Sequence, residues 1–315
     1  MSFLLTVLGS SSALPTSKRY PSAHALNVHE HFFLIDCGEG TQLQLRKFKF
    51  RFAKINHIFI SHLHGDHIFG LPGLISTFNL LGRTSELCIY GHLDFQQYLS
   101  CFQNQFGKDL LFHIRFVPLK ANRQKVIFEN RQVIVESIPL RHRIPTIGFL
   151  FREKEKDRNI RKEVIEKYEI GIKDILRIKQ GGDYITRDGQ TIPNQELTIP
   201  PFKGRTYAYC ADTLYHKSLA ERIKNVDLLY HEATFMDKDR KLAKLTMHST
   251  AAQAASIAKQ ANAGKLLIGH FSSRYKGTDE IVKEARTIFE NTEAVEDGNQ
   301  YHVLQQRKKY ENSPL

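Results

Sequence analysis

The feature that most constrains this chain is a cluster of metal-ligand side chains directly after a short apolar run. Residues 58–60 (IFI) predict a buried strand, and the sequence HLHGDH follows at residues 62–67. Zinc accepts both imidazole nitrogen and carboxylate oxygen as ligands. In a loop that leaves a strand end, the spacing lets His62 and His64 point one way and Asp66 and His67 another. The motif therefore predicts two metal sites.

Four side chains cannot complete two zinc sites, so this hypothesis requires further ligands later in the chain. His142, Asp212 and His270 each follow a β-like run, as the first cluster does. A single histidine after a strand is usually an ordinary loop residue, but a sheet that brings all these strand ends to one edge would gather seven ligands. We assign one zinc ion to His62, His64 and His142, the other to Asp66, His67 and His270, and the bridging position to Asp212.

Two zinc ions that share a bridging oxygen would supply hydroxide near neutral pH, because a bound ion lowers the pKa of water to about 7. Cleavage of a phosphodiester also needs a stabilised leaving group. His248 is the candidate proton donor, with Glu232 as its orienting partner. Asp36 stands beside two glycines, which favours a turn or a hydrogen bond to a ligand over direct ligation. Nine other histidines receive no role.

The bulk composition bounds the class of protein. A chain of 315 residues with 41% hydrophobic content can form its own core as one large domain. The four cysteines are scattered without C-x-x-C spacing, which argues against a zinc ribbon and favours a reducing, cytoplasmic compartment. No apolar stretch approaches the roughly 20 residues that span a bilayer, so no membrane association is expected. The net charge of +12 favours a polyanionic partner such as nucleic acid.

Strands and helices alternate in both halves of the sequence. Strands are expected at residues 2–8, 24–28, 31–36, 86–91, 111–117, 205–211, 226–230, 265–269 and 301–304, with a hairpin at 124–139. Helices are expected at 41–48, 74–81, 93–106, 251–261 and 278–290, and Ser249 or Thr250 is a plausible N-cap. Lys18 and Arg19, in the loop after the first strand, either are solvated or lie near a phosphate.

Residues 152–200 differ in composition from the rest of the chain. This stretch is densely charged and is interrupted by glycine and proline. Its apolar residues suggest one or two short amphipathic helices. We interpret it as an arm inserted into the main domain, and the alternative is a structured surface excursion without a partner.

Together these motifs resemble the metallo-β-lactamase superfamily and, within it, the ribonuclease Z family, whose members remove 3′ trailers from precursor tRNA. Residues 61–83, SHLHGDHIFGLPGLISTFNLLGR, are similar to the family signature. Further segments follow in the family's order: FLIDCGEGTQLQL, HRIPTIGF, YCADT, HEATF followed by His248, and GHFSSRY. The resemblance covers essentially the whole chain.

The resemblance implies an α/β fold of the α+β type, a single αββα sandwich over residues 1–315 with the dinuclear site at one edge. It also implies a homodimer. Asp66 would act as general base as well as ligand, and Glu232 and His248 would assist at the scissile phosphate. Residues 152–200 occupy the position of the family's flexible, tRNA-gripping arm (exosite). The Gly/Pro-rich arm tip is replaced here by residues 169–174 (EIGIKD).

We therefore expect a zinc-dependent endoribonuclease that removes the 3′ trailer from precursor tRNA by attack of a metal-bound hydroxide. The product would be a tRNA with a 3′-hydroxyl. One alternative is a superfamily hydrolase that acts on a small phosphodiester or ester, but such a substrate needs no long charged arm. Another is an RNA-binding protein with a structural metal site, for which the acid/base pair would be surplus.

Overall fold

The structure is a computed structural model that describes residues 2–14 and 16–308. The chain divides into two compact units. Among the described residues, we call 2–152 and 206–303 the body, and 153–205 and 304–308 the arm unit. No helix in the described residues is long and apolar enough to cross a membrane.

The first sheet of the body has seven strands and is covered by helices of the N-terminal half. Its strand order is β18 (Gln300–His302), β1 (Phe3–Gly9), β2 (Ala23–Val28), β3 (His31–Ile35), β4 (Ile55–Phe59), β5 (Leu87–His92) and β6 (Ile114–Leu119). Strands β3 to β6 are parallel, so their carboxyl ends share one edge. The accompanying helices are α1 (Thr41–Lys47), α2 (Gly65–Ile68), α3 (Leu71–Leu80) and α4 (Phe95–Phe106).

The second sheet also has seven strands. Its order is β17 (Thr292–Ala294), β16 (Lys265–Gly269), β15 (Leu228–Glu232), β14 (Thr206–Cys210), β9 (Ile147–Glu153), β8 (Val133–Pro139) and β7 (Lys125–Glu129). Strands β14 to β17 are parallel to one another, and β9 pairs antiparallel with β14. Its helices are α8 (Ser218–Arg222), α9 (Arg240–Thr246), α10 (Ala251–Gln260) and α11 (Asp279–Arg286). Thr250 caps α10 and forms a capping box with Gln253.

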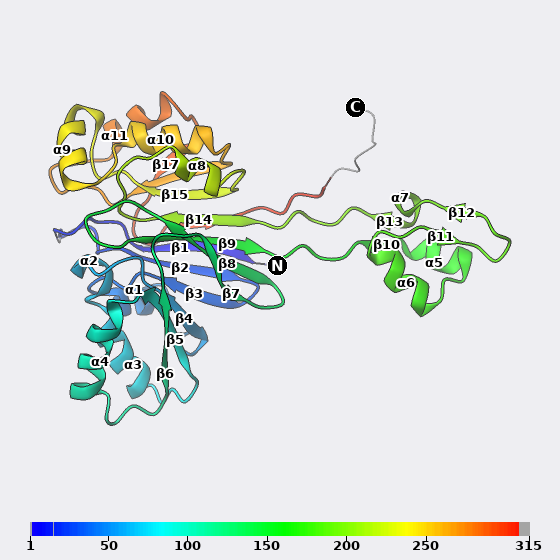
Figure 1. Cartoon of the computed structure of the whole chain (residues 1–315), viewed down its shortest axis with the longest axis horizontal. Coiled ribbons are helices and arrows are strands. Elements are labelled where there is room, and N and C mark those ends of the chain that lie inside the picture. Colours follow the sequence, from blue (N-terminus) through cyan, green and yellow to red (C-terminus); the bar gives the residue numbers. More distant parts are fainter. Residues whose placement is uncertain (1, 15, 309–315) are drawn as a thin grey trace. The chain divides into compact units, whose positions relative to one another are not determined.

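The two sheets pack face to face between two helical layers (Figure 1). Aromatic side chains from both inner faces meet in the core. Phe59 of β4 lies with its ring centroid 5.3 Å from that of Phe149 and 5.5 Å from that of Phe151, both on β9. All three are buried. The predicted αββα sandwich is therefore confirmed.

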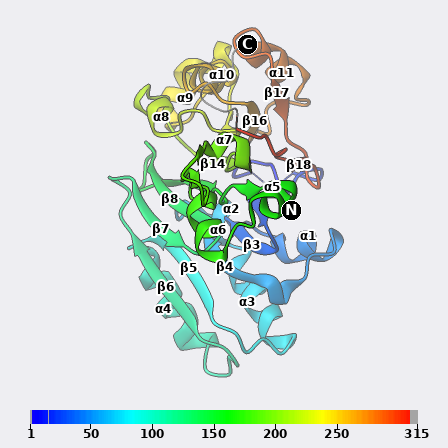
Figure 2. The same cartoon turned by 90° about the vertical axis from the view of Figure 1, so that its right-hand side faces the viewer.

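The arm unit has a small core of its own. Its elements are β10 (Asn159–Ile160), α5 (Lys162–Tyr168), α6 (Ile172–Lys179), β11 (Tyr184–Ile185), β12 (Thr191–Ile192), α7 (Asn194–Leu197) and β13 (Thr198–Ile199) (Figure 1). Figure 2 labels its helices α5, α6 and α7. Ile170, Ile178, Tyr184, Ile192 and Leu197 are buried together. Because β10 pairs antiparallel with β13, the chain leaves this unit beside the point where it entered. The sequence predicted one or two short amphipathic helices in this stretch; α5 and α6 correspond to them, and α7 is a third helix.

Most other boundaries agree with the sequence expectations to within one residue, and a minority differ by two to four residues. The expected strand at 226–230 is displaced, since β15 includes His231 and Glu232. Part of the metal motif, expected to be a loop, is the short helix α2. The helices α2, α8 and α9 were not predicted. They have four, five and seven residues, so their limits depend on packing more than on an apolar repeat.

Candidate metal centre

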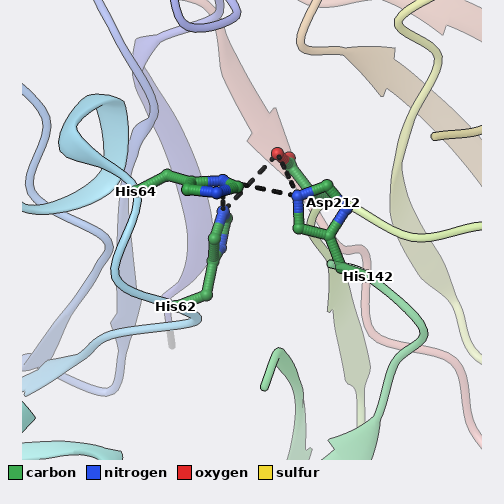
Figure 3. Close-up of side chains that lie close together, drawn as sticks. All are labelled: His62, His64, His142 and Asp212. Atoms are coloured by element: carbon green, nitrogen blue, oxygen red, sulfur yellow. Dashed lines mark hydrogen bonds and ion pairs between the residues drawn. The ribbon is translucent and has the colours of Figure 1, made fainter. Parts of the chain in front are cut away.

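Seven imidazole and carboxylate side chains converge at the edge of the body where the parallel strands end. The ligand atoms of His62, His64, His142 and Asp212 lie within 4.8 Å of one another (Figure 3). A second group contains Asp66, His67 and His270. These are the two sets that the sequence assigned to two ions.

Strand ends and the loops after them place these residues. His62 and His64 follow β4, His142 follows β8, Asp212 follows β14 and His270 follows β16 directly. Asp66 and His67 lie on α2. His270 has a positive φ of 60°, a backbone conformation that costs free energy in a non-glycine residue. The body holds this residue in a strained turn at the metal centre.

Asp212 has the geometry of a bridge between the two groups. Its Oδ2 lies 3.5 Å from His62 Nε2 and 3.8 Å from His142 Nε2. Its Oδ1 lies 3.6 Å from His67 Nε2 and 3.2 Å from His270 Nε2. Each carboxylate oxygen therefore faces a different group.

Hydrogen bonds on the Nδ1 side orient four of the five imidazoles. His67 Nδ1 donates to Asp36 Oδ2 at 2.7 Å, and His142 Nδ1 donates to the Met247 carbonyl at 2.9 Å. His62 Nδ1 lies 2.9 Å from Ser61 Oγ. Because the Ser61 hydroxyl donates its hydrogen to Asp36 Oδ2, its oxygen accepts from His62.

A hydroxyl that donates to a carboxylate also orients His270. Its Nδ1 lies 2.9 Å from Thr234 Oγ1, whose hydrogen is donated to Glu232 Oε2 at 2.7 Å. With hydrogen on Nδ1 in all four rings, each Nε2 presents a lone pair to the centre. Ligating histidines in metalloproteins are held in this way by partners behind them.

The centre also concentrates negative charge, and in the part of the chain that the structure describes no lysine or arginine forms an ion pair with its carboxylates. Burial by itself would raise the pKa of the Asp36, Asp212 and Glu232 carboxyls, but the neighbouring imidazoles lower all three. The ion pairs of these carboxylates within the described residues all involve histidine. Two buried atoms, His67 Nε2 and Asp212 Oδ1, have no hydrogen-bond partner there. This donor set fits divalent cations bound through nitrogen and oxygen.

Glu232 and His248 form a pair beside the ligands. His248 Nδ1 lies 3.0 Å from Glu232 Oε1. The carboxylate is fixed by the backbone N–H groups of Thr213, Thr234 and Ser249. Burial of His248 would lower its pKa, but Glu232 and then Asp212 raise the pKa of the imidazole to about 9. Such a pair can hold a proton on the imidazole for transfer.

A cavity of about 700 Å³ opens onto these groups. His64, Asp66, His142, His248 and His270 line it. Its wall includes two exposed apolar side chains, Leu14 and Phe69, and the guanidinium-bearing Arg143. The cavity is large enough for a polyatomic substrate to lie next to the side-chain atoms that could bind metal.

Lys18 and Arg19, which the sequence placed in solvent or near a phosphate, do not line this cavity. Arg19 Nη1 instead donates to Ser10 Oγ at 2.9 Å and to the Val295 carbonyl at 2.8 Å. Asp36 lies behind His67 and reaches His62 of the other ligand group through the Ser61 hydroxyl. That position agrees with the expected hydrogen bond to a ligand.

Sequence reasoning missed most of the supporting partners. Ser61, Thr234, Tyr209 and the carbonyl of Met247 received no role, although each contacts a ligand or Asp36. The sequence contained a signal for Ser61, because this hydroxyl residue immediately precedes the ligand His62. None existed for Met247, because a backbone carbonyl acts irrespective of its side chain.

The chain is similar to known proteins over most of its length. A family model described as "Anti-Pycsar protein Apyc1" matches residues 3–156. The chain is 48% identical over 290 residues to a protein named ribonuclease Z from Phocaeicola vulgatus, covering 92% of this chain and 94% of that one. It is 45% identical over 301 residues to the protein of the same name from Parabacteroides distasonis, covering 96% and 99%.

Solved structures show the same fold. The short form of human tRNase Z superposes with a TM-score of 0.68 at 27% identity, covering 95% of this chain and 98% of that one. The metallo-β-lactamase fold protein YhfI from Bacillus subtilis gives a TM-score of 0.69 at 20% identity, covering 96% and 100%. At that identity the second likeness concerns the fold alone.

Proposed function

Since this chain belongs to the ribonuclease Z family, we propose that it is an endoribonuclease that removes the 3′ trailer from precursor tRNA. The product is a tRNA with a 3′-hydroxyl. The observation that carries the proposal is the convergence of seven imidazole and carboxylate ligands in two groups that share Asp212. A protein that only bound RNA would not need the Glu232–His248 pair beside them.

The seven ligands would hold two zinc ions per subunit, with Asp212 as a ligand shared by both groups. When bound, divalent ions lower the pKa of water and offset charge on the phosphoryl oxygens. His62, His64 and His142 would hold one ion, and Asp66, His67 and His270 would hold the other.

The remaining roles concern protons and the RNA. The Asp66 carboxylate accepts a proton from the attacking water as general base. His248, oriented by Glu232, donates a proton to the leaving O3′ of the tRNA, so the tRNA ends in a 3′-hydroxyl and the phosphate stays on the trailer. Phe69 and Leu14 offer apolar surface on which bases beside the scissile phosphate can stack.

Further parts of the chain serve binding. Residues 152–200 hold the body of the tRNA. A homodimer is supported by the exposed Leu43 of α1 and Leu80 of α3, two helices that pack together. The scattered cysteines favour a cytoplasmic location.

The experiment that tests this function compares two RNAs of equal length, an end-labelled precursor tRNA and an unstructured RNA, with the zinc-loaded protein. A single cut after the discriminator base, in the tRNA alone, is the expected result. Hydrolysis of a small phosphodiester without a cut in either RNA would overturn the assignment and favour a small-substrate hydrolase.

A further inference from the structure

A second hollow lies at the same edge of the body, on the other side of the loop that carries His142. Its volume is about 630 Å³. It is lined where β5, β6 and β8 end, and by α8 with the segment before it. Nothing in the proposed reaction uses these residues.

The hollow gathers positive charge without a carboxylate. Lys120, Arg141 and Arg222 line it, and no aspartate or glutamate does. None of the three makes an ion pair within the described part of the chain. His92 also lines it but pairs with Asp94 at 3.2 Å. By contrast, the metal cavity contains three carboxylates, Glu39, Asp66 and Asp212. Concave surfaces lined by one sign of charge concentrate counter-ions.

His216 adds an unsatisfied polar group to this lining. The residue is 7% exposed, and its Nδ1 lies 3.1 Å from Ser218 Oγ. Its Nε2 is buried and has no hydrogen-bond partner among the described residues. Burial and then repulsion from Arg141 lower the pKa of the imidazole to about 4, so the ring is neutral at pH 7. A buried polar atom without a partner costs free energy that a ligand can recover.

The hollow is joined to the metal centre through backbone. Arg141 immediately precedes the ligand His142, and its carbonyl accepts from the N–H of Leu214 at 2.6 Å. Its own N–H donates to Thr213 Oγ1 at 3.1 Å. A group bound by Arg141 would therefore contact the residue that precedes the ligand His142 in the sequence.

We propose that the hollow formed by Lys120, Arg141, His216 and Arg222 binds a phosphate group. Guanidinium groups match two phosphate oxygens at once, and an ammonium adds a point charge. The phosphate comes either from the RNA strand that enters the metal centre or from free phosphate in solution. The first source rests on the proposed function, whereas the second does not.

The test uses two double variants of the zinc-loaded protein. Lys120→Gln with Arg222→Gln removes two charges from the hollow and leaves Arg141, the neighbour of a ligand, in place. Lys217→Gln with Lys224→Gln removes two exposed charges nearby that do not line it. Circular dichroism establishes that each is folded. If the first pair does not fold, either single variant replaces it.

Two measurements distinguish RNA phosphate from free phosphate as the ligand of the hollow. Radiolabelled orthophosphate is titrated to count binding sites, and the wild type is expected to bind one equivalent more than the hollow variant. A precursor tRNA whose scissile O3′ is replaced by a methylene group, so that the P–O3′ bond cannot be hydrolysed, is titrated at several salt concentrations. Loss of one phosphate contact lowers the slope of log K against log salt by about one. The Lys217/Lys224 variant should match the wild type in both.

Loss of the orthophosphate equivalent alone identifies free phosphate as the ligand. A lower salt slope, with or without that loss, identifies the RNA strand. If the hollow variant matches the Lys217/Lys224 variant in both titrations, the proposal is overturned. Should the wild type fail to cut precursor tRNA, the proposed function fails, and the orthophosphate titration still decides whether the hollow is a site.

Discussion

Asp36 is the residue on which the orientation of the first ligands depends. Its carboxylate accepts from the Ser61 N–H and hydroxyl, from His67 Nδ1 and from the Tyr209 hydroxyl. Through Ser61 it also fixes His62. One buried carboxylate thus sets the ring orientation of a ligand in each of the two groups.

Asp36→Asn should weaken metal binding while the protein stays folded. Asp36 has a φ of 57°, and asparagine tolerates that conformation well. Its amide cannot accept all four hydrogen bonds, so metal affinity should fall about 10–100-fold, the usual cost of losing a ligand's supporting partner. Competition with a chromophoric chelator measures this affinity without reference to activity.

Two tyrosines of β14 provide the matched comparison. Tyr209→Phe removes one donor to Asp36 and should have a smaller effect of the same sign. Tyr207→Phe removes an equally buried hydroxyl that bonds His24 Nδ1 instead. Equal losses of metal affinity in the two variants would show that buried hydroxyls matter only for packing.

His64→Ala should lower the zinc content and abolish cleavage. His64 is half-buried, and its Nδ1 faces His62 Nε2 at 3.0 Å and His142 Nε2 at 3.3 Å, so the ring supports no core packing. The fold should therefore survive. Elemental analysis counts the metal, and circular dichroism reports the fold. Full activity in this variant would refute the ligand assignment.

His248→Ala should slow cleavage of RNA by about 10²–10⁴ in kcat, the usual contribution of a general acid. A p-nitrophenyl phosphodiester should lose much less, because nitrophenolate leaves without a proton. Glu232→Gln should have the same selectivity in weaker form, since it orients His248. The kcat ratio of the two substrates is the measurement, and an equal loss on both would exclude the proton-donor role.

At the scale of the elements, strand ends were the part of the site that sequence could predict. Apolar runs before His142, Asp212 and His270 revealed where each would lie, because parallel strands deliver their carboxyl ends to one edge. The helix α9 and the loop to His248 carried no comparable signal. Their positions follow from tertiary contacts, such as the Met247 carbonyl on His142, that no local pattern encodes.

The arm can be removed at its base. β10 and β13 pair antiparallel, so a short Gly-Ser linker can replace residues 159–199 without displacing the ends. Cleavage of precursor tRNA should fall about tenfold to a hundredfold, the scale of one or two lost RNA contacts. Hydrolysis of a small phosphodiester should stay unchanged. Equal loss on both substrates would mean that the arm supports the active site.

Across the whole molecule, the arm contributes little of the positive charge. Residues 153–205 contain twelve lysines and arginines against ten carboxylates, whereas the chain has a net charge of +12. Most of the excess therefore lies outside this stretch. Sequence composition predicted a polyanionic partner, but only the fold reveals that cations such as Lys120, Arg141 and Arg222 gather at the edge that holds the metal ligands.

The proposed homodimer should depend on the apolar side chains of α1 and α3. Leu80 is 84% exposed and Leu43 is 56% exposed, more than an isolated subunit requires. Leu43→Lys with Leu80→Lys should shift the protein to monomers in light scattering, because charges are strongly disfavoured in such an interface. Val126→Lys, on the strand β7, is the control. If the arm serves the partner's site, monomers should cut precursor tRNA poorly yet hydrolyse a small phosphodiester normally. A wild type that is already monomeric, or a monomer with full activity on tRNA, would contradict this arrangement.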